Sequence, residues 1–125
     1  MIKTIVLVGM GGGVGSILRY LTAVLVNKYF NGAFPLATFL INIVGCLIIG
    51  ILMSAVERYT WADDNFKYVF ITGFCGGYTT FSAFANENVF LMNTGQSLVA
   101  FSYIAASVVA GLFCVWLGMV LGKAF

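Results

Sequence analysis

Four long apolar segments, separated by short polar ones, dominate this sequence. They span about residues 4–26, 35–56, 68–92 and 97–121. Each is long enough to cross about 30 Å of hydrocarbon as a helix, which takes roughly 20 residues. Because 62% of the residues are hydrophobic and only 8% are charged, the chain could not cover its own surface with polar groups. We therefore predict an all-α membrane protein with four transmembrane helices in one domain, residues 1–125.

The charged residues gather in the connections between these segments. Residues 57–67 hold five of the ten charges, so this connection is expected in water. Four spans place both termini and this connection on one side. The cations there are Lys3, Arg58, Lys67 and Lys123, and the other side has Lys28 alone. This bias favours a cytoplasmic N-terminus. The first segment is expected to be retained, because it is long and has no clear small-residue cleavage site.

The residue types support little catalytic or metal chemistry. The sequence has no histidine, and each of its three cysteines stands alone in an apolar segment. No nucleophile pairs with a recognisable base, so we predict no enzyme and no catalytic residue. No basic cluster indicates nucleic acid as a partner. The glycines of residues 10–15 do not form the GxGxxG pattern of a dinucleotide loop in any register.

Glycines recur at a spacing of four residues in three of the segments. The pairs are Gly9 and Gly13, Gly11 and Gly15, Gly73 and Gly77, and Gly118 and Gly122. In membrane helices this spacing lets two backbones approach closely, so we expect these glycines at helix–helix contacts. Four helices of about 22 residues make a thin bundle that can barely shield a pathway from lipid. Assembly into a homodimer is the simplest expectation.

The third segment contains residues that weaken a helix in mid-membrane. Gly76-Gly77 is followed by Thr79-Thr80 near the middle of the apolar run. A helix broken at that depth is tolerated only inside protein or beside a wet cavity. Such a break exposes backbone carbonyls and helix ends, which bind ions. We predict that the third helix is broken here, the alternative being a continuous helix with a close contact at the glycines.

Two further polar residues lie inside apolar segments. Arg19 either snorkels to a headgroup or pairs with Glu87, a backbone carbonyl or water. Asn42 lies four residues after Thr38, so the two side chains share one helix face. Its amide offers two donors and an acceptor, which suit either a hydrogen bond between helices or an ion pathway. The residues alone leave both alternatives open.

Phe81 and Phe84 follow the predicted break and lie three residues apart on one helix face. A phenyl ring has an electropositive edge, so two such edges could touch a small anion without presenting a full charge. Phenylalanines at this spacing also commonly face lipid or a protein core. In the fourth segment, Tyr103 and Ser107 repeat the spacing of four residues and could add hydroxyl groups to the same track.

Together these motifs resemble those of the small fluoride channels of the Fluc or CrcB family, over essentially the whole chain. The first segment contributes Gly11-x-x-x-Gly15-x-x-Leu18-Arg19, and the second contributes Thr38-x-x-x-Asn42-x-x-Gly45. The third contributes Gly73-Phe-Cys-Gly-Gly-x-Thr-Thr-Phe-Ser-x-Phe84-x-x-Glu87, which is long and highly specific.

The resemblance implies an antiparallel, dual-topology homodimer with two fluoride pathways. It assigns Asn42, Thr80, Phe81, Ser82, Phe84, Tyr103 and Ser107 to the pathway. It assigns Gly76 and Thr79 to the break whose backbone carbonyls hold a structural sodium ion at the dimer interface. It identifies Arg19, Thr38 and Glu87 as polar residues of the vestibule or of the structure.

Two features depart from the family pattern. The family usually reads Phe-Ser-Thr-Phe, whereas Ala83 stands here in place of the threonine, so one hydroxyl group of the track is missing. The second departure is the four-to-one bias in cations, since a dual-topology protein is expected to be nearly unbiased.

The resemblance and the residues together predict a passive, fluoride-selective channel. It would be a multi-pass protein of the cell inner or plasma membrane that lowers cytoplasmic fluoride. An inside-negative potential drives anions outward at about 2.3 kcal/mol per charge per 100 mV, so no other energy source is required. One alternative is a small proton-coupled multidrug or cation exporter, which needs an embedded carboxylate. The other is a non-transporting membrane subunit.

Overall fold

Three long helices and one interrupted helical segment make up the fold. A computed structural model describes residues 1–124. The long helices are α1 (Ile2–Tyr29), α2 (Leu36–Arg58) and α6 (Ser97–Ala124). Between α2 and α6 lie four short elements, which are α3 (Asp64–Phe66), the π-helix η1 (Lys67–Cys75), α4 (Gly76–Tyr78) and α5 (Phe81–Asn93). No strand occurs among these 124 residues, which confirms the all-α prediction.

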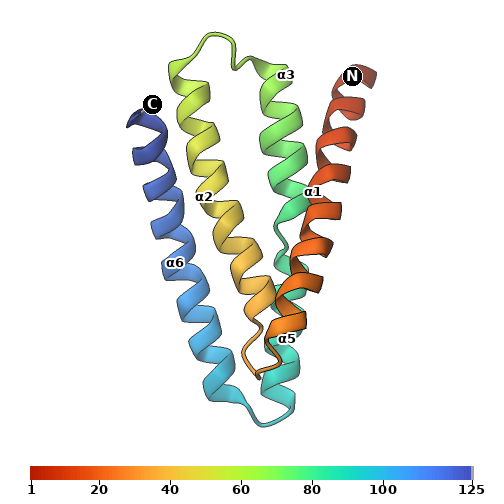
Figure 1. Cartoon of the computed structure of the whole chain (residues 1–125), viewed down its shortest axis with the longest axis vertical. Helices are drawn as coiled ribbons and strands as arrows, with labels where there is room; N and C mark the ends of the chain where they lie inside the picture. Colours follow the sequence, from red (N-terminus) through yellow and green to blue (C-terminus); the bar gives the residue numbers. More distant parts are fainter. Residues whose placement is uncertain (125) are drawn as a thin grey trace.

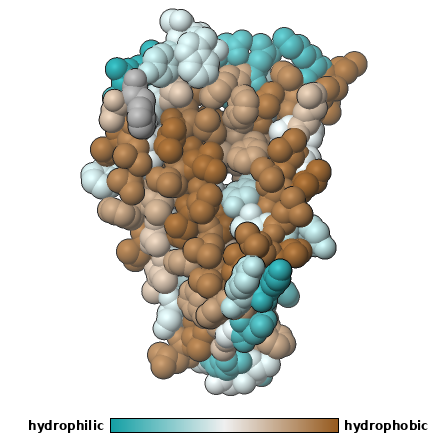
Figure 2. Space-filling view, viewed as in Figure 1, coloured by the Kyte–Doolittle hydropathy of each residue, from teal (hydrophilic) through white to brown (hydrophobic). Residues whose placement is uncertain are grey.

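Helices α1, α2 and α6 are each long and apolar enough to cross a membrane. Figure 2 shows the apolar surface that they form, with hydrophilic residues concentrated toward the ends of the molecule. Many large apolar side chains are exposed on this surface, as lipid requires. The chain is therefore a multi-pass membrane protein. The predicted span 68–92 falls on the interrupted segment and includes no single helix of comparable length.

The elements form two packed pairs. Helix α2 lies along α6, and α1 lies along η1 and α4, while α5 packs on the lower part of α6. Figure 1 shows both termini and the α2–α3 connection at one end of the molecule. The α1–α2 and α5–α6 connections lie at the other end. This arrangement puts the four cations that were expected to share a side at the same end.

Glycines bring the backbones of both pairs into contact. A Cβ atom on Gly11 or Gly15 would overlap with the backbone of η1 or α4, and one on Gly77 would overlap with Gly12. Gly118 meets the backbone of α2 in the same way, and Gly122 meets Ser54. The expectation that these glycines lie at helix contacts is confirmed. For Gly9 and Gly13 it is wrong within this chain, because a Cβ there would have nothing within 4 Å.

The connections that frame the interrupted segment are built by specific end motifs. At the α5–α6 turn, Gly95 has φ +78°, and the N–H of Gln96 donates to the carbonyl of Leu91 at 2.8 Å, which closes a Schellman motif. At the other end, Asp63 caps α3 by accepting from the N–H of Phe66 at 3.0 Å. This bond, together with one from the Asn65 side chain, lowers the pKa of the Asp63 carboxyl.

Candidate functional site

Thr79 and Thr80 separate α4 from α5 near the middle of the interrupted segment. Thr79 has φ −79° and ψ 160°, and Thr80 has φ −149° and ψ 119°, so both residues are extended. The glycines that were expected to weaken the helix are not the extended residues. Gly76 keeps helical angles, with φ −63° and ψ −37°, and Gly77 serves the contact with α1. The nine residues of η1, which precede α4, form a π-helix. We did not predict this π-helix from the sequence.

Asn42 of α2 replaces the helical bond that the N–H of Thr80 lacks. Its Oδ1 accepts from the N–H of Thr80 at 2.9 Å, and its Nδ2 donates to the carbonyl of Thr80 at 3.1 Å. The side-chain amide thus pairs with both polar groups of one backbone residue. In an apolar surrounding the N–H would otherwise remain without a partner, whereas the carbonyl of this N-cap residue also accepts the first bond of α5. Asn42 still has one amide hydrogen and one lone pair free of these two bonds.

On the side of the break that faces α1, side chains of α1 donate hydrogen bonds to backbone carbonyls. Arg19 donates through Nη1 to the carbonyl of Thr79 at 3.3 Å, and Ser16 donates to the carbonyl of Gly77 at 3.4 Å. Of the partners considered for Arg19, the structure therefore shows a backbone carbonyl. Thr80 caps α5, because its Oγ1 accepts from the N–H of Ala83 at 3.2 Å.

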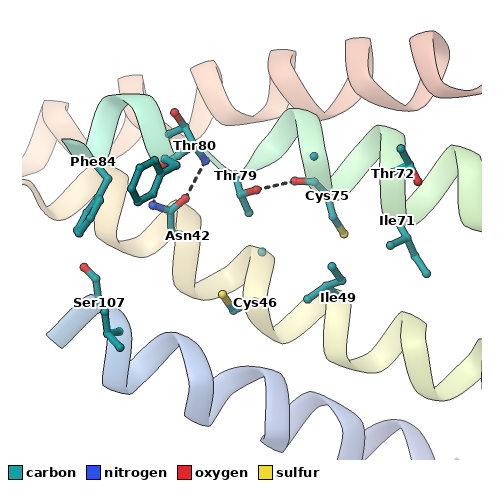
Figure 3. Close-up of a pocket in the computed structure, with 14 residues that line it drawn as sticks. Asn42, Cys46, Ile49, Ile71, Thr72, Cys75, Thr79, Thr80, Phe84 and Ser107 are labelled. Atoms are coloured by element: carbon teal, nitrogen blue, oxygen red, sulfur yellow. Dashed lines mark hydrogen bonds between the residues drawn. The ribbon is translucent and has the colours of Figure 1, made fainter. Parts of the chain in front are cut away.

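A cleft of about 510 Å³ opens on the side of the break that faces α2 and α6. Figure 3 shows its walls, with Asn42 bonded to Thr80 and with Ser107 of α6 directed toward Phe84. Seven of the predicted site residues line it, namely Asn42, Gly76, Thr79, Thr80, Phe81, Phe84 and Ser107. Most of the remaining wall is apolar, so the polar groups of the break lie at one end of a largely hydrophobic cleft.

The two phenylalanines differ in the fraction of the residue that is exposed. Phe81 is 79% exposed, whereas Phe84 is partly buried. Their ring centroids are 5.7 Å apart. Phe84 also meets Tyr103 edge-to-face, with centroids 5.0 Å apart and an angle of 64° between the ring planes. The aromatic contacts therefore lead from the cleft to a second polar cluster.

That second cluster surrounds Glu87. The carboxylate accepts from the hydroxyl of Thr38 through Oε1 and from that of Tyr103 through Oε2, the latter at 2.9 Å. Tyr103 is fully buried, and Thr38 is 7% exposed. A smaller cavity of about 360 Å³ is lined by Glu87, by other residues of α5 and by residues of the α1–α2 and α5–α6 connections. The cluster thus lies between the two cavities.

The hydroxyl of Ser107 stands out because it has no hydrogen-bond partner among the residues that the structure describes. Its Oγ is buried, although Ser107 lines the cleft. A hydroxyl group withdrawn from water without a partner costs about 1–3 kcal/mol. A rotation of the Ser107 side chain about Cα–Cβ would be needed for this hydroxyl to reach an occupant of the cleft.

The structure divides the predicted site residues among three places. Seven line the cleft, Thr38, Glu87 and Tyr103 form the second cluster, and Arg19 lies on the α1 side of the break. Ser82 is not part of the cleft wall and is exposed, with its Oγ 3.3 Å from that of Thr80. The sequence interpretation missed Ser16, whose position three residues before Arg19 on the same helix face was an available signal. It also missed Thr72 and Cys75 on the cleft wall, both of which belong to the π-helix η1.

Comparison with known proteins gives consistent matches over almost the whole chain. The profile of the family described as "CrcB-like protein, Camphor Resistance (CrcB)" matches residues 6–119. A protein of Flavobacterium psychrophilum called "Fluoride-specific ion channel FluC" is 50% identical over 121 residues, which cover 97% of this chain and 98% of the relative. One of the same name from Azobacteroides pseudotrichonymphae is 44% identical over 125 residues, the full length of both. One from Nitratidesulfovibrio vulgaris is 40% identical over 121 residues.

Proposed function

The chain belongs to the CrcB-like family, and we propose that it is a fluoride-selective channel through which fluoride leaves the cytoplasm passively. The observation that carries this proposal is the cleft beside the break. There Asn42, Phe81, Phe84 and Ser107, whose buried hydroxyl has no partner among the described residues, line one cavity. These groups are weak hydrogen-bond donors or ring edges rather than full charges. They suit an anion that has to bind and then leave again.

The interrupted segment serves as the third of four membrane spans. Its extended residues, Thr79 and Thr80, lie about halfway between the charged start of α3 and the turn after α5. At that depth their backbone groups need partners, which Asn42 and Arg19 supply. The break therefore brings donors into the membrane interior without leaving them unsatisfied.

Fluoride loses most of its water on entering such a path. The hydroxyl of Ser107, the free amide hydrogen of Asn42 and the ring edges of Phe81 and Phe84 replace part of that hydration. Phe84 contacts Tyr103, whose hydroxyl reaches Glu87. The path then continues past this cluster to the cavity at the other end. Because the compensation is distributed over several weak sites, no single site traps the ion.

The working unit is an antiparallel homodimer with two pathways. Support comes from the incomplete enclosure of the cleft and from Phe81, a large apolar side chain that is 79% exposed beside it. One four-helix chain is too thin to shield such a path from lipid. The chain inserts in both orientations into the cell inner membrane. The bias of four cations against one favours a single orientation, so a measurement of the orientation of the inserted chain tests this point.

A sodium ion at the centre of the dimer fits the residues at the break. In a continuous helix the N–H of Thr80 would bond the carbonyl of Gly76, but here it donates to Asn42. The Gly76 carbonyl is thereby free of its helical donor, and Gly76 is exposed. Gly76 and Thr79 would hold the ion through their carbonyl oxygens, the type of ligand that hard cations prefer, with the Thr79 carbonyl also accepting from Arg19. The ion would make the centre of the dimer more electropositive.

Fluoride efflux from liposomes tests the proposed function. The purified protein is reconstituted in liposomes loaded with potassium fluoride, and a fluoride electrode follows efflux after valinomycin is added to carry the charge. We expect rapid release of fluoride and no matching release from chloride-loaded liposomes. Release that needs a proton gradient would favour a proton-coupled exporter instead. No release from folded protein would refute the channel.

A further inference from the structure

Four aromatic rings form a continuous ladder at the end of the molecule that carries both termini. Tyr59 stacks on Trp61 with ring centroids 5.5 Å apart, and Trp61 meets Phe66 edge-to-face at 5.3 Å. Phe66 in turn lies 4.8 Å from Phe70. The ladder begins in the α2–α3 connection and continues along η1. It therefore links the polar end of the molecule to the apolar span below it.

Two rings of the ladder are exposed and the other two are partly buried. Trp61 is 62% exposed and Phe70 is 44% exposed, while Tyr59 and Phe66 are partly covered by the chain. The indole N–H of Trp61 and the hydroxyl of Tyr59 have no hydrogen-bond partner among residues 1–124. Side chains with an apolar body and a polar tip are favoured where one end meets hydrocarbon and the other meets water.

Charged groups lie beside the first three rings of the ladder. The guanidinium of Arg58 lies 5.7 Å from the centre of the Tyr59 ring, and Lys67, the first residue of η1, pairs with Asp64 at 2.9 Å. Beyond Lys67, η1 and α4 carry no charged residue as far as the break. The change from charged residues and aromatic residues with polar tips to Phe70 and an uncharged segment matches the change from headgroups to hydrocarbon at a bilayer surface.

We propose that Tyr59, Trp61, Phe66 and Phe70 form a membrane-interface anchor whose partner is the headgroup and glycerol layer of phospholipids. The polar tips of Tyr59 and Trp61 bond to phosphate or ester oxygens, and the rings of Phe66 and Phe70 enter the outer acyl chains.

The position of the anchor has a consequence for the candidate site. Thr79 lies nine residues beyond Phe70 in the chain, a rise of at most about 14 Å at α-helical spacing and less through the π-helix η1, against a half-thickness of about 15 Å for the hydrocarbon. An anchor with Phe70 at the edge of the hydrocarbon therefore sets the break in the inner part of the bilayer, short of its centre. The inference does not depend on which ion the chain conducts.

The two tryptophans of the chain provide a matched test, because Trp116 lies on the exposed face of α6 about 12 Å before the helix end. Trp116→Phe leaves Trp61 as the only tryptophan, and Trp61→Phe leaves Trp116. Both proteins are reconstituted in phosphatidylcholine with bromine atoms on the upper, middle or terminal third of the acyl chain. Fluorescence quenching then reports the depth of each indole. Circular dichroism checks that both variants keep the helical fold.

We expect bromine on the upper third to quench Trp61 most strongly, and bromine deeper in the chain to quench Trp116 most strongly. The result is the same in either orientation of the protein, because both leaflets carry the quencher. If aqueous iodide quenches Trp61 and no brominated lipid does, the connection lies in water and the anchor is refuted. If terminal bromine quenches Trp61 most strongly, the ladder lies too deep and the inferred depth of the break is wrong.

Discussion

The α2–α6 pair and the interrupted segment from α3 to α5 meet the same membrane requirement by different means. In α2 and α6 the helix satisfies its own backbone, and Gly50 and Gly118 let the two backbones approach closely. At the break, side chains from other helices satisfy the backbone, since Asn42 and Arg19 bond to backbone groups of Thr79 and Thr80. The regular pair therefore leaves no backbone group for an ion, whereas the interrupted segment concentrates polar groups at one depth.

The regular pair can be broken by adding one methyl group. Gly118→Ala places a Cβ against the carbonyl oxygen of Leu47 and 3.0 Å from the Cα of Gly50. Because both neighbours are backbone atoms, the helices have to move apart. We expect a loss of about 3 kcal/mol or more, the upper range for overpacking. Thermal unfolding in detergent, followed by circular dichroism, measures the effect.

Gly13→Ala is the matched control for this change. A Cβ at residue 13 has nothing within 4 Å, so only the higher helix propensity of alanine acts. We expect the protein to be as stable as the parent or more stable. If Gly118→Ala is equally well tolerated, the close packing of α2 on α6 is not what holds this pair. If Gly13→Ala is harmful, the exposed face of α1 lies in a contact between subunits.

The interrupted segment can be broken through Asn42. Asn42→Leu keeps the approximate volume but leaves the N–H of Thr80 without a partner and removes one of the two donors to its carbonyl, which keeps its bond in the first turn of α5. An unsatisfied buried group costs about 1–3 kcal/mol, so we expect a loss on the order of 2 kcal/mol. We also expect fluoride efflux from liposomes to fall to background, because the donors at the break lose their positions.

The corresponding control is Asn27→Leu, because Asn27 is exposed on α1, lines neither cavity and makes no side-chain hydrogen bond among residues 1–124. We expect this variant to keep its stability and to conduct. Asn42→Asp sharpens the test, since it retains an acceptor for the N–H of Thr80 but loses the donor to its carbonyl. An Asn42→Leu protein with parental stability would show that the break does not depend on α2.

The sequence predicted more of the regular elements than of the interrupted segment. The apolar runs predicted α1, α2 and α6 because length and hydropathy alone determine such helices in lipid. The break was expected at paired glycines and threonines, but only the threonines are extended, since Gly77 is required by its contact with Gly12. The π-helix η1 was not predicted, and three residues of the cleft wall, Ile71, Thr72 and Cys75, belong to it. It packs along α1, a contact between distant segments that the local sequence does not encode.

Replacing Phe81 or Phe84 is expected to have a smaller effect, which is limited to fluoride transport. Phe81→Leu and Phe84→Leu each remove a ring edge from the cleft while keeping an apolar side chain. We expect fluoride efflux to fall about tenfold or more, equivalent to about 1.4 kcal/mol. Because Phe81 is 79% exposed, its replacement leaves the stability of the chain nearly unchanged.

Phe113→Leu is the matched control for these rings. Phe113 is 54% exposed on α6 and contacts Trp116 rather than the cleft. We expect its efflux to stay within about twofold of the parent, the usual range for a surface substitution. Parental efflux in both cleft variants would remove the rings from the proposed pathway.

The smallest effect concerns Ala83, where the family usually has threonine. Although residue 83 lies between the two phenylalanines of the motif, it is not part of the cleft wall, and its N–H already bonds to the Oγ1 of Thr80. Ala83→Thr adds a hydroxyl beside the cleft rather than in it, in the first turn of α5. We therefore expect efflux to change by no more than about twofold. A much larger increase in the same liposome assay would mean that the fluoride path includes residue 83 and is wider than the cleft of a single chain.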